Sequence, residues 1–169
     1  MNVPSTELST EKENKSLAVV AIENGTVIDH IPAGKGILIL QLLALESHRN
    51  KVTVGMNLPS AQMKAKDLIK IENRELLFSE TSQIAIFAPR ATINIIENYH
   101  VAKKYVVELP TSIEHFVICP NPRCITNHEK VSRQYEVSSL RKQEILLKCK
   151  FCEKTFNRSE INRYSFGSS

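Results

Sequence analysis

The chain has 169 residues, of which 42% are hydrophobic, and a formal net charge of +4 at neutral pH. No apolar run reaches the roughly 18–20 residues that span a bilayer, and the polar first residues lack the apolar stretch of a signal peptide. These features argue against a membrane or secreted protein. They predict a cytoplasmic chain that folds as one medium domain or two small ones.

Charge is unevenly distributed along the chain. Residues 1–110 hold 12 basic and 12 acidic residues, whereas residues 111–169 hold 10 basic and 6 acidic residues. The whole net charge of +4 therefore comes from residues 111–169. A basic segment is one feature of nucleic-acid-binding proteins. The basic residues are scattered among acids, however, so nucleic-acid binding remains an alternative and not the leading hypothesis.

The first part of the chain predicts a short extension, two strands and a helix. Residues 1–15 are polar and aperiodic, which is typical of a disordered extension. The apolar run 16–23 predicts a buried strand, and Asn-Gly at 24–25 predicts a hairpin to a second strand over 26–31. Residues 33–47 are apolar on nearly every side and predict a helix that is buried on more than one face.

The next predicted elements are strands over 51–59 and 66–73, a helix over 79–89 with Ser79 as its N-cap, and two strands within 91–109. This order favours a ferredoxin-like α+β domain, one antiparallel sheet with two helices on one face. The polar segment 108–115, which contains Pro110, predicts a linker. We therefore expect one domain over 16–108 and a second over 109–169.

Four cysteines lie in the second predicted domain as two close pairs. Cys119 and Cys124 are separated by four residues, and Cys149 and Cys152 by two. In a cytosolic chain such pairs favour thiolate metal ligands over disulfides, and four thiolates in two knuckles predict a tetrahedral zinc site. Because four protein ligands leave no open position, we expect a structural zinc that folds a small antiparallel β domain.

Other candidates for chemistry are weaker. His115 and His128 lie near the cysteines, but four thiolates already complete the site. The phosphate-loop, GxSxG and HExxH patterns do not occur, which argues against an enzyme of those classes. Asp29 and His30 are a possible acid–base pair, although adjacent strand residues point to opposite faces and should not bond each other directly.

Several stretches resemble the regulatory chain of aspartate carbamoyltransferase: GTVIDHIPA at 25–33, VGMNLPS at 54–60, KDLIKIEN at 66–73, CPNPRC at 119–124 and LKCKFCEKTF at 147–156. They occur in the order of that family, and the resemblance spans residue 16 to about residue 157. It implies a non-catalytic allosteric subunit in pyrimidine biosynthesis, with a nucleotide-binding domain and a zinc domain. It also implies that CTP and UTP inhibit, that ATP activates, and that three regulatory dimers bridge two catalytic trimers.

The resemblance also implies site residues. The nucleotide site would consist of Ala21, Ile22, Asp29, His30, Lys70, Thr92, Asn94, Ile96, Tyr99, Val101 and Lys104. Within it Ala21 and Ile22 would read the base, Asp29 and Lys70 would bind the ribose, and His30 and Lys104 would face the phosphates. Contacts with the catalytic chain would come from Asn121, Arg141 and Glu153. The alternatives are a zinc-ribbon nucleic-acid-binding protein and a small zinc enzyme, the latter disfavoured by the saturated metal site.

Overall fold

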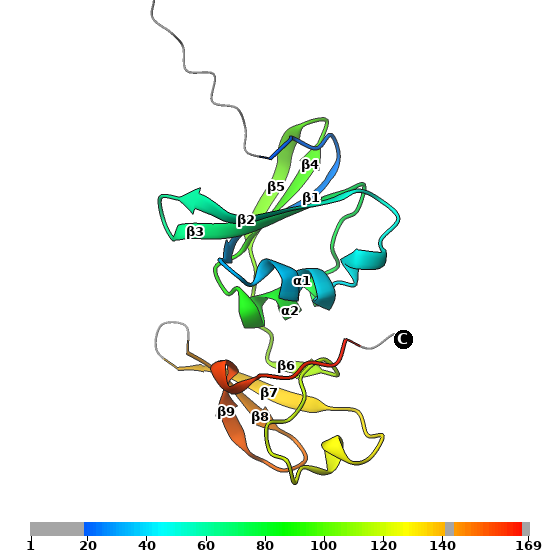
Figure 1. The fold of residues 1–169 in the computed structure, drawn as a ribbon, viewed down its shortest axis with the longest axis vertical. Helices are drawn as coiled ribbons and strands as arrows, with labels where there is room; N and C mark the ends of the chain where they lie inside the picture. Colours follow the sequence, from blue (N-terminus) through cyan, green and yellow to red (C-terminus); the bar gives the residue numbers. More distant parts are fainter. Residues whose placement is uncertain (1–18, 141–143, 167–169) are drawn as a thin grey trace, which may run out of the picture.

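The computed structural model describes residues 19–140 and 144–166. Its upper part in Figure 1 is an antiparallel sheet with two helices below it, and a second, smaller sheet lies beneath the helices. Within the described residues no helix combines the length and the apolar character that a bilayer crossing requires.

The first sheet and its helices consist of β1 (Gly25–Pro32), α1 (Gly36–Leu42), β2 (Val52–Ser60), β3 (Lys64–Glu72), α2 (Phe78–Phe87), β4 (Thr92–Glu97) and β5 (His100–Val106). The strands lie in the order β2-β3-β1-β4-β5, and each neighbouring pair is antiparallel. The first four strands have the order of a ferredoxin-like sheet, with β5 added beyond β4. The predicted α+β fold is confirmed.

The second sheet consists of β6 (Ser112–Glu114), β7 (Gln134–Leu140), β8 (Glu144–Cys149) and β9 (Thr155–Asn157), in that order across the sheet. Short 3-10 turns are η1 (Leu45–Ser47) beside α1, η2 (Ile125–Asn127) in the β6–β7 connection and η3 (Arg158–Glu160) after β9. Part of the predicted linker 108–115 is therefore a strand, since β6 pairs with β7.

The predicted strand over 16–23 and its hairpin are wrong within the described part of that segment, residues 19–23. The Val19 and Val20 carbonyls accept hydrogen bonds from the Lys70 ammonium, at 3.2 and 2.6 Å, and do not pair with a strand. A glycine is required at position 25 because the backbone of β3 passes very close to it, and not because the chain makes a tight turn there. Its φ is +135°, and a Cβ added there would lie 2.0 Å from the Ile71 carbonyl oxygen.

Both helices differ from their predicted bounds. Helix α1 is shorter than the expected 33–47, because Gly34 (φ 84°) and Ala44 (φ 50°) adopt left-handed conformations that interrupt a helix on either side. Helix α2 begins at Phe78, with Leu77 and not Ser79 as the N-cap. The Glu80 carboxylate accepts the Leu77 N–H at 2.8 Å, so a carboxylate satisfies that backbone donor.

Two hydrophobic cores meet at α2. Ile84 and Ala85 pack in the core under the first sheet, whereas Ile86 and Phe87 pack in the core of the second. The Phe87 ring lies 5.9 Å from the ring of Phe116 and 5.4 Å from that of Tyr164. The helical layer is therefore enclosed between the two sheets (Figure 1).

A cation from the second part of the chain also holds the end of α2. The Arg158 guanidinium donates a hydrogen bond of 3.0 Å to the Ile86 carbonyl in the last turn of the helix. Carbonyls at a helix C-terminus lack partners within the helix, and a cation there is favourable. Burial lowers the pKa of Arg158 from its ordinary value.

A four-cysteine metal centre and a polar face on the first sheet

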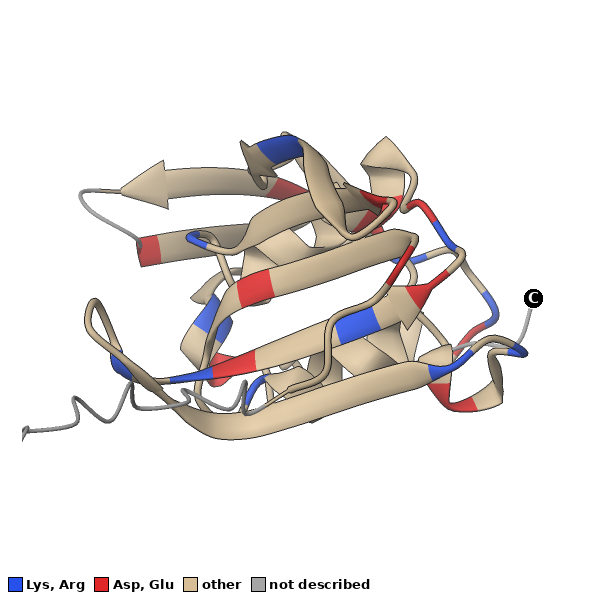
Figure 2. Ribbon diagram, turned by 90° about the horizontal axis from the view of Figure 1, so that it is seen from above, with Lys and Arg blue, Asp and Glu red and all other residues tan. Residues whose placement is uncertain are grey.

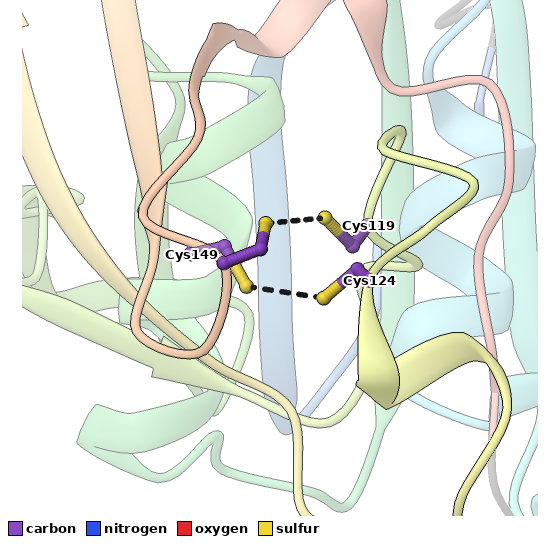
Figure 3. A group of neighbouring side chains, drawn as sticks. Cys119, Cys124 and Cys149 are labelled. Carbon is purple, nitrogen blue, oxygen red and sulfur yellow. Dashed lines mark hydrogen bonds between the residues drawn. The ribbon is translucent and has the colours of Figure 1, made fainter.

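The four predicted cysteines lie together at one end of the second sheet. Cys119 and Cys124 flank a loop before η2, Cys149 ends β8, and Cys152 lies in the following turn. Figure 3 shows the thiols of Cys119, Cys124 and Cys149 converging from the two sides. The Sγ atoms of Cys119 and Cys152 are 3.7 Å apart, those of Cys124 and Cys149 are also 3.7 Å apart, and all four lie within 4.8 Å of one another.

These distances fit a zinc ion. Zinc–sulfur bonds of about 2.3 Å in a tetrahedron separate the sulfurs by about 3.8 Å. Burial raises the pKa of Cys119 and of Cys149 above that of an ordinary thiol. Burial also acts to raise the pKa of Cys152, but hydrogen bonds from the Asn121 side chain and the Lys154 backbone lower it to about 7. A cation that stabilises all four thiolates suits such a donor set, and the centre is that of one structural zinc.

The loop around the first cysteine pair is held by amide hydrogen bonds. The Asn127 side-chain nitrogen donates to the carbonyls of Cys119 and Asn121, each at 2.9 Å. His128 binds the Pro122 carbonyl at 2.7 Å, and His115 lies near Ser132, so neither histidine belongs to the thiol cluster. Asn121 and Glu153, the expected partner contacts, lie beside the metal centre, and Arg141 lies outside the described residues.

A row of polar side chains crosses the face of the first sheet that is turned away from the helices. Lys70 on β3 pairs with Val27 on β1, Val27 with Asn94 on β4, and Asn94 with Lys104 on β5. Directly opposed residues on neighbouring strands point to the same face. Their neighbours Ile28, Ile69 and Ile93 point to the other face and form the core with the helices. The structure therefore brings Lys70, Asn94 and Lys104 onto one surface.

Asp29 and His30 lie at the end of the same face, in a β-bulge. The register between β1 and β3 shifts between Ile28 and Ile31, and His30 has a φ of 58°. This bulge brings the His30 backbone N–H to the Asp29 carboxylate at 2.6 Å, whereas the His30 ring Nδ1 lies 3.7 Å from Asp29 Oδ2, so the two side chains do not share a hydrogen bond. The His30 ring lies 3.0 Å from the Thr92 hydroxyl, measured from Nδ1 to Oγ1.

Lys66 is a residue of this site that the sequence analysis missed. Its ammonium lies 2.7 and 2.9 Å from the two Asp29 carboxylate oxygens. Burial acts to raise the pKa of Asp29, but the hydrogen bond from Lys66 and that from the His30 backbone outweigh it, so the pKa is lowered. The sequence does contain a signal that points to Lys66: it lies four residues from Lys70 on one strand, so the two side chains share a face of the sheet.

The remaining predicted residues lie at the other end of the face. Tyr99, in the turn between β4 and β5, donates its backbone N–H to the Glu23 carbonyl at 2.9 Å, which places it beside the segment that carries Ala21 and Ile22. Ile96 pairs with Gly25 on one side and with Val101 on the other. Ala21 is exposed but Ile22 is buried, so only the backbone of Ile22 suits a contact with a ligand.

The fold and its two polar regions define a class: an α+β domain with a polar sheet face, joined to a small β domain with a closed four-thiolate metal centre. Comparison with known sequences identifies the family. The family model "Aspartate carbamoyltransferase regulatory chain, allosteric domain" matches residues 17–108, and "Aspartate carbamoyltransferase regulatory chain, metal binding domain" matches residues 111–162.

Curated relatives with the name aspartate carbamoyltransferase regulatory chain agree with these matches. The relative from Tolumonas auensis is 49% identical over 150 residues, which cover 89% of this chain and 97% of the relative. That from Photobacterium profundum is 51% identical over 145 residues, which cover 86% and 94%. The chain belongs to the family of aspartate carbamoyltransferase regulatory chains, which supports a regulatory and non-catalytic subunit.

Proposed function

We propose that the chain is the allosteric subunit of a cytoplasmic aspartate carbamoyltransferase in pyrimidine biosynthesis. It binds CTP and UTP as inhibitors and ATP as an activator on its first domain, residues 16–108. Its zinc domain, residues 109–169, attaches it to the catalytic chain, with three regulatory dimers between two catalytic trimers. The observation that carries the proposal is the row formed by Lys70, Asn94 and Lys104, with Asp29 and His30 beside it, on the helix-free face of the sheet.

The chemistry of this face suits a nucleoside triphosphate. Lys104 and His30 supply donors for phosphate oxygens, and Asp29 supplies a carboxylate that accepts hydrogen bonds from ribose hydroxyls. Lys66 already binds Asp29, which orients that carboxylate. Lys70 is held by the Val19 and Val20 carbonyls, so this lysine also fixes the chain segment that leads to Ala21 and Ile22.

The base would lie between that segment and the β4–β5 turn. Tyr99 is 64% exposed and Val101 is 57% exposed, so both offer apolar surface to a ring. The backbone groups of Ala21 and Ile22 offer donors and acceptors that can distinguish an amino from a keto substituent. Between the place of the base and that of the phosphates, β4 contributes Thr92, Asn94 and Ile96. A surface of this kind offers the same place to a pyrimidine or a purine base.

The surface around the metal centre suits the contact with the catalytic chain. Ile125 and Phe151, in the two cysteine-containing loops, are 46% and 44% exposed. Exposed apolar side chains with polar neighbours such as Asn121 and Glu153 are typical of a protein interface, and we propose Arg141 as a further contact. Figure 2 shows acidic and basic positions interspersed across the molecule, which favours a protein partner over nucleic acid.

The deciding test is calorimetry of CTP binding to the zinc-loaded regulatory subunit and to its Lys104→Ala variant. We expect CTP affinity to fall at least about tenfold, because one charge-assisted contact with phosphate is lost. The matched control is Lys103→Ala, since Lys103 pairs with Ile95 and belongs to the alternate positions of the same strand. Unchanged affinity in Lys104→Ala, or an equal loss in the control, would show that the site is elsewhere.

A further inference from the structure

The most deeply buried carboxylate that the structure describes has no role in the function proposed above. Asp67 on β3 is 0% exposed and lies on the helix side of the sheet, at the end of the row that continues with Ile69 and Ile71. No Lys, Arg or His in residues 19–140 and 144–166 lies within ion-pair distance of it. A buried carboxylate is costly unless hydrogen bonds compensate it, so its partners indicate why it is there.

Three backbone N–H groups from two different segments bind Asp67. One oxygen accepts from Gly34 at 2.8 Å and from Gly36 at 2.9 Å, in the loop between β1 and α1. The other oxygen accepts from Asn57 on β2 at 2.9 Å. The contact is close, because a Cβ added to Gly36 would lie 3.1 Å from the carboxylate.

These hydrogen bonds join two β-bulges at the same level of β3. On one side the β1–β3 register shifts between Ile28 and Ile31, which leaves Asp29 and His30 in the bulge. On the other side the β2–β3 register shifts between Gly55 and Leu58, around Asn57. His30 and Asn57 both have left-handed backbones, with φ of 58° and 53°. A bulge inserts an extra residue and redirects side chains at the place where it forms.

We infer that Asp67 is the positioning residue of the nucleotide site: by holding the Gly34–Gly36 loop and Asn57, it keeps the β1 bulge at Asp29–His30 and so directs His30 toward the phosphates. This inference rests on the proposed nucleotide function. On the upstream side the bulge is fixed by the pairing of Ile28 with Ile69. On the downstream side it is fixed by Asp67, through the loop that directly follows β1.

The test compares CTP with cytidine, which has the same base and ribose but no phosphates, on the zinc-loaded regulatory subunit. Asp67→Asn keeps the size of the side chain but replaces one acceptor oxygen with a donor. We expect CTP affinity to fall on the order of tenfold, the effect of one lost charge-assisted contact, and cytidine affinity, measured by competition, to change little. Gly36→Ala, which presses a methyl group against the carboxylate, should act in the same direction by a smaller factor and serves if Asp67→Asn does not fold.

The matched control is Lys35→Ala, in the same loop between Gly34 and Gly36. The Lys35 side chain is exposed, and its backbone N–H donates to the Pro32 carbonyl at 3.0 Å and not to Asp67. This variant should keep the ratio of CTP to cytidine affinity. The NMR signals of the His30 amide and ring in the ligand-free subunit should move in Asp67→Asn and Gly36→Ala but stay in place in Lys35→Ala.

Two results would overturn the inference: equal losses for CTP and cytidine, or His30 signals that do not move when Asp67 is changed. If the unaltered subunit binds no CTP, the proposed nucleotide function fails. The His30 signals still decide in that case whether Asp67 sets the geometry of the bulge.

Discussion

At the scale of single residues, the ion pair between Asp29 and Lys66 organises the outer face of the first sheet. Both side chains are about one-fifth exposed, at 20% and 19%, so the pair is only partly screened by water. The pKa of Asp29 is lowered in the folded chain. A carboxyl group of this kind contributes stability above its unfolded pKa, and the contribution is lost as the pH falls through the folded pKa.

Lys66→Met should therefore destabilise the chain at neutral pH by about 1–2 kcal/mol, because Asp29 keeps its charge and loses its partner. The difference from the unaltered chain should begin to shrink as the pH falls past the ordinary carboxyl value of 3.8, and it should disappear below the lowered folded pKa of Asp29, where that carboxyl becomes neutral. Urea unfolding at a series of pH values measures both effects. Lys64→Met, at an exposed lysine on the same strand, should show neither. A difference that is independent of pH would rule out the ion pair as the cause.

At the scale of secondary structure, α2 belongs to both cores. Phe87 is 5% exposed and contacts the rings of Phe116 and Tyr164, whereas Phe78 at the other end of the helix is 71% exposed. The two phenylalanines therefore form a natural comparison between a packed and a solvated ring on one helix.

Phe87→Ala should lower the free energy of unfolding by about 3–5 kcal/mol, the usual cost of deleting a buried aromatic ring. Phe78→Ala should change it by about 0.5 kcal/mol or less, as is usual for an exposed site. Denaturant unfolding of the zinc-loaded chain, followed by circular dichroism, gives both values. Similar effects for the two variants would mean that the last turn of α2 is not packed as described.

The sequence predicted the α+β class, most strand bounds and the cysteine cluster, because apolar periodicity and ligand spacing are local signals. It failed where long-range contacts override local pattern. Asn-Gly at 24–25 is typical of a hairpin, but Gly25 is required by its distance from Ile71 across the sheet. The period-two alternation of a strand could not predict the bulge at His30. It also could not predict that Asp67, a charged residue at a core position, accepts hydrogen bonds from three N–H groups that are distant in the sequence.

At the scale of the whole molecule, the metal centre is part of the second core. Cys119, Cys124 and Cys149 pack in the same cluster as Phe87 and Phe116. The small second domain should therefore depend on its metal for stability, since structural zinc contributes about 10–16 kcal/mol to the folding of such units. The first core, which includes Ile28, Ile69 and Ile93, has no metal ligand among its buried residues.

Removal of zinc by a chelator, or the Cys149→Ser substitution, should therefore loosen the second domain and the last turn of α2 but leave the first sheet folded. Hydrogen exchange followed by mass spectrometry should show faster exchange in β7, β8 and the end of α2, with protection kept in β1 and β3. Loss of protection in all of these strands at once would show that the two cores unfold as a single unit.

The position of β1 in the first sheet has a consequence for synthesis of the chain on the ribosome. Among the strands of the described residues it is the first made, yet it is the central strand of its sheet, and both of its partners, β3 and β4, are made later. In the same way, Cys119 and Cys124 are synthesised before Cys149 and Cys152, with which they form the metal centre. Because translation proceeds at about 5–20 residues per second, the apolar β1 segment stays unpaired for seconds in each nascent chain. Chaperone capture or aggregation in the cell should therefore act most strongly on chains that are halted before β4 emerges.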